Sequence, residues 1–173
     1  MEDTSAFCLN YTHSNESKIS FAWNGKHAEE FVDTNLKFRR NLIEFVIKNL
    51  DSAPFDLIKD LYKAETLFAK EAWGVNNSVL FFAETILRRG TVQDLDDFVS
   101  GYMQSFDTDM CIQGIKLPNE ILQVFAKECS RRLLDPQYGS QKKIYESLLN
   151  LFSATPTKIR WFQRFMNWFS KQD

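Results

Sequence analysis

Hydrophobic residues recur three or four positions apart through most of this chain, a spacing that is typical of α-helices. Capping residues, Gly and Pro interrupt this pattern at short intervals and mark where helices begin and end. We expect helices over residues 34–50, 54–73, 79–89, 91–106, 118–134 and 140–152. Since successive helix pairs span about 35 to 45 residues, the pattern predicts a mainly α fold, either a single-domain helical bundle or a short HEAT-like helical stack.

The first 25 residues follow a different pattern. Phe7, Leu9 and Tyr11 alternate with other positions, and Ile19, Phe21 and Trp23 do the same after a polar segment. A period of two is typical of β-strands, because successive side chains of a strand point to opposite faces. Residues 1–25 are therefore a candidate small N-terminal β-hairpin, and residues 33–153 are the expected helical core of a single domain, 1–173.

Residues 155–171 predict a C-terminal amphipathic helix. Its aromatic face holds Trp161, Phe162, Phe165, Met166, Trp168 and Phe169, with Arg160, Arg164 and Lys171 opposite. We interpret it as a capping helix that buries this face on the helices before it. The alternative is a membrane-surface or adaptor protein that docks through this basic, aromatic helix. Burial of Trp161 and Trp168 in the free protein would separate the two.

Composition narrows the function further. The 173 residues include 16 Phe but only 6 Gly and 4 Pro, which favours helices over a sandwich or barrel. A net charge of −2 disfavours a nucleic-acid-binding protein. The acidic start resembles no signal peptide, and no apolar run reaches the ~18 residues of a membrane span. Three cysteines without a CxxC motif favour reduced thiols over a disulfide framework or zinc site. We therefore expect a cytoplasmic protein without stable membrane insertion.

The most distinctive feature is a run from Thr91 to Ile115 that contains five Asp and neither Lys nor Arg. Asp94, Asp96 and Asp97 fall where a helix begins, and the helix dipole stabilises carboxylates there, so a capped, solvated helix explains them. Asp107 and Asp109 are expected after that helix, in a loop, where this explanation fails. A one-signed surface attracts a basic partner and fixes where it docks. The predicted partner-binding residues are Asp94, Asp96, Asp97, Asp107, Asp109, Met110 and Ile112.

No sequence motif supports catalysis, metal binding or nucleotide binding as strongly as the aspartates support a basic partner. The zinc, hydrolase and nucleotide-binding motifs HExxH, GxSxG, GxxxxGK[ST] and GxGxxG are absent. Asp107 and Asp109 lack the further ligands of a calcium loop, so we expect neither a metal nor a cofactor. A general base at His27 with Glu29 or Glu30 is the remaining enzymatic hypothesis. We expect no catalytic residues and hence no enzyme.

The junction RRGTVQDLDDF at residues 88–98 resembles helix junctions in HEAT-like families of bacterial immunity proteins, in which a helix ends in Gly-Thr and the next begins with acidic residues. These families protect bacteria from the toxins of contact-dependent growth-inhibition and related polymorphic toxin systems. The resemblance extends over residues 35–135.

This resemblance implies a protein that binds and neutralises a cognate toxin domain. Nuclease toxins bind phosphates in a basic cleft, which an acidic surface could occlude. Asp107, Asp109 and the apolar residues Met110, Ile112 and Ile115 would form the inserting element, because tight binding requires desolvated apolar anchors between the charges. The net charge of −2 is modest for a nuclease inhibitor.

Overall fold

The computed structural model describes residues 3–153, and every regular element in that range is a helix. The mainly α-helical fold predicted from the hydrophobic spacing is thereby confirmed. The backbone divides into two compact units, one that ends at Lys116 and one that begins at Leu117. The grouping of the whole chain into a single domain stays a prediction, and the helix predicted over 155–171 lies outside the described residues.

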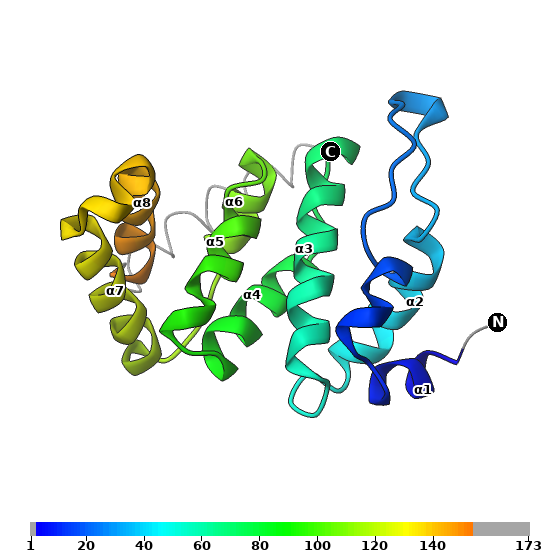
Figure 1. Cartoon of the computed structure of the whole chain (residues 1–173), viewed down its shortest axis with the longest axis horizontal. Coiled ribbons are helices and arrows are strands. Elements are labelled where there is room, and N and C mark those ends of the chain that lie inside the picture. Colours follow the sequence, from blue (N-terminus) through cyan, green and yellow to red (C-terminus); the bar gives the residue numbers. More distant parts are fainter. Residues whose placement is uncertain (1–2, 154–173) are drawn as a thin grey trace, which may run out of the picture. The chain divides into compact units, whose positions relative to one another are not determined.

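The first unit is built around one long helix, α3 (Phe55–Ala72), which packs against three of the helices that follow it. The elements of this unit are α1 (Thr4–Leu9), η1 (His13–Lys18), η2 (Ala28–Glu30), α2 (Leu36–Ile47), α3, α4 (Ser78–Arg89), η3 (Val92–Asp94), α5 (Leu95–Tyr102) and α6 (Phe106–Ile112), where η marks a 3-10 helix. Figure 1 shows α3 between α2 and α5. Leu57, Leu61, Phe82 and Phe98 are fully buried at the centre of this unit.

Short local signals set the helix boundaries as the sequence indicates. Pro54 lies directly before α3, where its missing N–H leaves no helical hydrogen bond unmade. Two arginines occupy the last turn of α4, and Gly90 follows it. The Cβ that any other residue would carry at position 90 would lie 2.5 Å from the carbonyl oxygen of Ile86. The chain therefore needs a glycine at this turn for lack of space.

The N-terminal hairpin predicted over residues 1–25 is wrong. Residues 4–9 form α1, begun by Asp3, whose carboxylate accepts a hydrogen bond from the Ser5 N–H at 2.9 Å. Phe7 and Tyr11 are buried, but Leu9 between them is 73% exposed, so the alternation does not mark one face of a strand. Trp23 forms an isolated antiparallel bridge with Asp33. The segment before α2 is therefore its partner, rather than residues 6–11.

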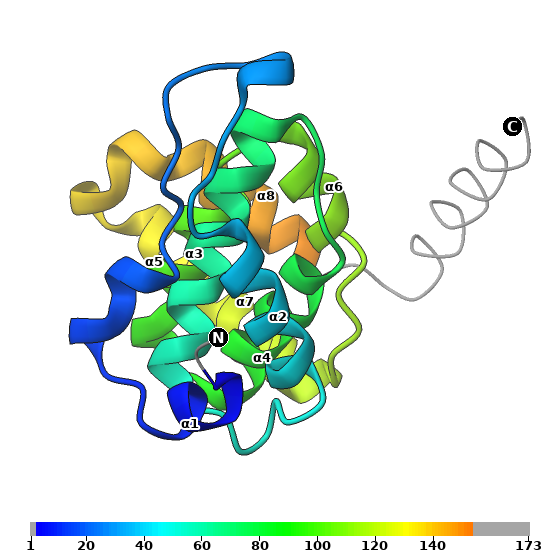
Figure 2. The ribbon, with the colours of Figure 1, turned by 90° about the vertical axis from the view of Figure 1, so that its right-hand side faces the viewer.

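A buried ion cluster fastens the long loop between η1 and α2 to the helices. The Arg39 guanidinium donates to the carboxylates of Asp33, at 2.6 Å, and Glu65, at 2.8 Å, and all three side chains are fully buried. Arg40 adds a second cation, 2.9 Å from Glu65. Figure 2 shows the loop, in blue, projecting beyond α1 and α2. Since Arg39 belongs to α2, Glu65 to α3 and Asp33 to the loop, the cluster fixes all three together.

The second unit is a helical hairpin. It contains α7 (Asn119–Leu134), η4 (Pro136–Gln141) and α8 (Lys142–Phe152). The rings of Phe125 and Phe152 lie 6.0 Å apart between its helices, and Arg132 of α7 donates a hydrogen bond to the Tyr145 hydroxyl at 2.9 Å. The predicted start at Pro118 and stop at Asp135 are confirmed. In neither unit is a described helix both long and apolar enough to span a bilayer.

Candidate functional site

Asp94, the first carboxylate of the acidic run, is held in place where α5 begins. Its Oδ2 accepts a hydrogen bond from the Thr91 N–H at 2.8 Å, and its Oδ1 lies 3.3 Å from Lys59 Nζ. Burial would raise the pKa of the Asp94 carboxyl, but the hydrogen bonds from Thr91 and Lys59 outweigh it and lower that pKa. The predicted N-cap at Thr91 is confirmed, since Thr91 and Asp94 form a capping box.

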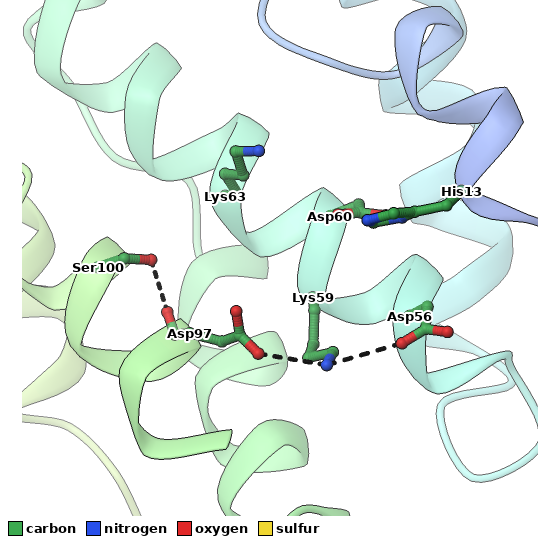
Figure 3. Close-up of a pocket in the computed structure, with 7 residues that line it drawn as sticks. All are labelled: His13, Asp56, Lys59, Asp60, Lys63, Asp97 and Ser100. Carbon is green, nitrogen blue, oxygen red and sulfur yellow. Dashed lines mark hydrogen bonds and ion pairs between the residues drawn. The ribbon is translucent and has the colours of Figure 1, made fainter. Parts of the chain in front are cut away.

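One lysine of α3 contacts carboxylates from two elements of the acidic run. Lys59 Nζ lies 3.2 Å from Asp97 and 3.3 Å from Asp94, and Asp56 of its own helix follows at 3.6 Å. Figure 3 shows Lys59 between Asp56 and Asp97. Burial would lower the pKa of Lys59, but the hydrogen bonds to Asp97 and Asp94 outweigh it and raise that pKa. One positive charge thus faces three negative ones, and the cluster stays acidic.

This cluster borders a polar pocket of about 380 Å³ between α3, α5 and η1. At its other side Asp60, which is buried, accepts a hydrogen bond from the Tyr11 hydroxyl at 2.7 Å and lies 3.0 Å from His13 Nδ1. Burial raises the pKa of Tyr11, and the bond to Asp60 raises it further. The side chains that line the pocket are polar or charged, so it can bind water or a polar group. The Tyr11 hydroxyl is not among them, because it donates its proton to Asp60.

Three side chains, two of which line this pocket, meet the distance requirement of a metal site. One ligand atom from each of His13, Glu16 and Asp60 lies within 4.8 Å of the others. Glu16 is, however, bound to Lys63 at 2.9 Å. This hydrogen bond raises the pKa of Lys63 by more than burial lowers it. A cation here would have to displace the Lys63 ammonium. The arrangement is explained as an ion-pair network between η1 and α3.

Asp107 and Asp109 do not lie in a loop, and that prediction is wrong. Ser105 begins α6, and its Oγ accepts a hydrogen bond from the Thr108 N–H at 3.1 Å. Both aspartates fall in the first turn, where the helix dipole stabilises them as it does Asp96 and Asp97 in α5. Asp109 also accepts a hydrogen bond from Gln113. Stabilisation of helix starts thus explains why all five aspartates occur at these positions. Their negative charge is nevertheless available to a partner.

The apolar residues near these aspartates are placed differently from the prediction. Ile112 and Ile115 are buried, so neither is a surface anchor, and Met110 is only partly exposed. A continuous helix over 91–106 would place Met103 and Phe106 on the same inward face as Phe98 and Tyr102, but they are 50% and 74% exposed. The reason is the break after Tyr102, which ends α5 before the helical spacing reaches these two residues. Phe106, the first residue of α6, is consequently the large apolar side chain beside Asp107.

The predicted site residues are only partly brought together. Asp94 and Asp97 converge on Lys59, and Asp96 is an exposed neighbour in the same first turn of α5. Asp107 and Asp109 belong to the next helix, which packs on α3, α4 and α5. The contacts of Lys59 with Asp94 and Asp97 could not be predicted from the sequence because Lys59 lies far from the acidic run in the chain. The spacing of Asp56, Lys59, Asp60 and Lys63 along α3 was the available signal.

The structure adds no support for a base at His27. Its ring lies 4.8 Å from the ring of Trp23, and the Glu30 carboxylate is bound to Lys26. The cysteines are free, and burial raises the pKa of Cys8, of Cys111 and, to about 12, of Cys129, which makes these thiols weak nucleophiles. Comparisons of the chain with models of protein families, with curated proteins and with solved structures give no significant match.

Proposed function

We propose that this protein is an immunity protein, which binds a basic toxin domain and occludes its active site with an acidic segment. This segment runs from Asp94 to Asp109, through the end of η3, α5 and the start of α6. The observation that carries the proposal is the excess of carboxylates on these helices. Five aspartates lie between positions 94 and 109, two of them, Asp94 and Asp97, contact Lys59, and the run from Thr91 to Ile115 contains no Lys or Arg. Such a surface steers a basic partner and raises its association rate.

Exposed apolar groups among these charges support a protein partner over a free ion. Phe106 is 74% exposed at the start of α6, directly before Asp107, and Met103 is half exposed at the end of α5. Aromatic anchors ringed by polar groups account for much of the affinity of protein interfaces. In the proposed complex, Phe106 replaces Ile112 as the anchor, and the aspartates around it set orientation and charge preference.

A nuclease is the toxin class that this chemistry fits. Its active site must bind nucleic-acid phosphates through a cluster of Lys and Arg, and carboxylates can satisfy the same cations. Two short helices that each present Asp in the first turn carry this charge on an ordered scaffold. The inhibitor would then compete with the substrate for the cationic groups, and binding should weaken as salt rises.

The test is capture of a partner from source cells with the tagged protein, next to an Asp107→Lys, Asp109→Lys double variant. We expect the parent to retain a toxin whose isolated C-terminal domain stops growth, and to restore growth when both are produced together. The double variant should lose capture and protection, because it places two cations against a basic cleft. Its circular dichroism should match that of the parent.

A matched control is Glu44→Lys, Asp51→Lys, which makes the same charge change at exposed positions outside the acidic segment. It should capture and protect like the parent. Equal capture by all three proteins would show that the acidic segment is only solvated surface. A captured domain without toxicity would remove the immunity function while leaving the interface in place.

A further inference from the structure

A second pocket, of about 560 Å³, lies between the loop that carries η2 and the end of α3. It is separate from the acidic segment and is lined mainly by apolar groups, among them Ala28, Phe31, Phe68 and Trp73, with His27 and Glu71 as the titratable groups. Its volume falls in the range of about 300 to 1,000 Å³ that small-molecule sites occupy, and such sites combine apolar walls with a few polar groups.

Trp73 occupies a position that its side chain does not favour. It directly follows the last residue of α3 and has φ 56° and ψ 43°, the left-handed conformation that glycine usually supplies at a helix end. The next residue is Gly74, so the chain has a glycine one position too late. The Trp73 side chain is 87% exposed, and it forms no ring contact with a described residue. Neither backbone preference nor burial accounts for this tryptophan.

The opposite wall, formed by the loop that carries η2, contains another residue in the left-handed conformation. Ala28 has φ 55°, and within residues 3–153 it and Trp73 are the non-glycine residues with positive φ. Hydrogen bonds hold this wall in shape: Trp23 Nε1 donates to the Lys26 carbonyl at 2.7 Å, and Asn24 Nδ2 donates to the Glu30 carbonyl at 2.7 Å. Unfavourable backbone conformations persist where the surrounding structure enforces them, often at ligand sites. The loop wall of this pocket is thus preformed.

The charges at the pocket indicate the kind of ligand. Glu71 lines it with a carboxylate that is 23% exposed, whereas no Lys or Arg of the described residues lines it. Within residues 3–153, Glu71 forms an ion pair with Lys70, at 3.9 Å and half exposed, which is a weak partner. Phe68 already lies 5.2 Å from the guanidinium of Arg40 and 5.8 Å from that of Arg39, but Trp73 has no such partner among the described residues. A ligand with a positive charge and an aromatic body would satisfy the carboxylate and the exposed ring together.

We infer that this pocket binds a small organic cation with an aromatic body, such as an arylalkylamine. Trp73 and Phe31 contact the aromatic body, and the Glu71 carboxylate accepts hydrogen bonds from the ammonium group. This activity is independent of the proposed immunity function, since none of the lining residues belongs to α5 or α6.

Two probes of similar size and opposite charge test the inference, 2-phenylethylamine and phenylacetate, titrated into the full chain. Binding is followed by the tryptophan indole N–H signals in NMR spectra. We expect saturable shifts with the amine and a dissociation constant about tenfold lower than with the acid, a difference of one favourable charge contact. Glu71→Gln should abolish this preference, and Glu44→Gln, on an exposed face of α2, should leave it unchanged.

Trp73→Asn provides the second arm, because asparagine adopts left-handed backbone more readily than tryptophan. We expect the amine to bind at least about tenfold more weakly to this variant, while the midpoint of urea unfolding is no lower than in the parent. A lower midpoint would make Trp73 a structural residue and overturn the inference. Equal binding of both probes, or no saturation with either, would overturn it too. So would a concentration-dependent dimer that the substitution abolishes, since a second copy would then occupy the pocket.

Discussion

Single side chains in this protein show which part of the acidic run supports the fold and which part faces outward. Phe98 lies in the middle of the run and is fully buried, with its ring stacked on those of Tyr62 and Tyr102 at centroid distances of 6.4 and 6.1 Å. Phe106 lies eight positions later and is mostly exposed. Two residues of the same type therefore have opposite roles within one segment.

Phe98→Ala should lower the free energy of unfolding by about 3 to 5 kcal/mol, because it removes a buried ring and leaves a cavity beside Tyr62. Phe106→Ala, the matched change at an exposed site, should shift it by less than about 0.5 kcal/mol. Urea denaturation followed by circular dichroism measures both. Similar losses for the two variants would show that Phe106 is part of the core.

At the level of helices, the boundaries that could be predicted from the sequence are those marked by proline or glycine. Pro54 and Pro118 mark the starts of α3 and α7 because the proline ring fixes φ and removes an N–H. Gly90 marks the end of α4 because a Cβ there would lie 2.5 Å from the Ile86 carbonyl oxygen. The prediction of a hairpin over residues 1–25 was wrong because three alternating residues are too few to distinguish a strand from one turn of helix. The single helix expected over 91–106 is interrupted, since Ser105 and Thr108 form a capping box that begins a new helix.

The candidate sites were harder to predict than the helices, for a physical reason. Lys59 meets Asp94 and Asp97 across 35 or more positions of sequence, and only packing of α5 on α3 brings them together. The left-handed conformation of Trp73 contradicts the usual preference for Gly at a helix end, since Gly74 comes one position later. Sequence rules describe what the backbone prefers, so they miss the positions where tertiary structure enforces something else.

The charged cluster of α7 gives the protein a specific response to acid. Hydrogen bonds from Arg131, then from Arg132, outweigh burial and lower the pKa of Glu128 from 4.5 to about 2. A carboxyl with a lowered pKa in the folded state stabilises it above the unfolded-state value, and this contribution is lost as the pH falls through the folded-state value. We expect Glu128→Gln to destabilise the protein at neutral pH, with a difference from the parent that shrinks between about pH 4.5 and 2.

Unfolding in urea at several pH values measures this difference. Glu120→Gln, at an exposed position in the first turn of the same helix, is the control. A difference between Glu128→Gln and the parent that is independent of pH would mean that the contacts of Glu128 do not depend on its charge.

At the scale of the whole molecule, the division into two compact units predicts that a substitution in one unit destabilises mainly that unit. Each unit has buried side chains of its own, with Phe98 in the first and Phe125 in the second. In native-state hydrogen exchange we expect Phe98→Ala to accelerate exchange in α3 to α5, and Glu128→Gln to do so in α7 and α8. Equal acceleration in both units by either variant would instead indicate one cooperative unit.

The position of Trp73 has a consequence for attempts to engineer this protein. Selection for thermal stability alone would favour glycine or asparagine at residue 73, since either adopts the left-handed backbone more readily than tryptophan. A stabilised variant obtained in this way would keep its helices and lose one wall of the aromatic pocket. Stability screens should therefore hold this residue constant, and any natural counterpart of the chain that keeps an aromatic residue here would be the first in which to look for the same ligand.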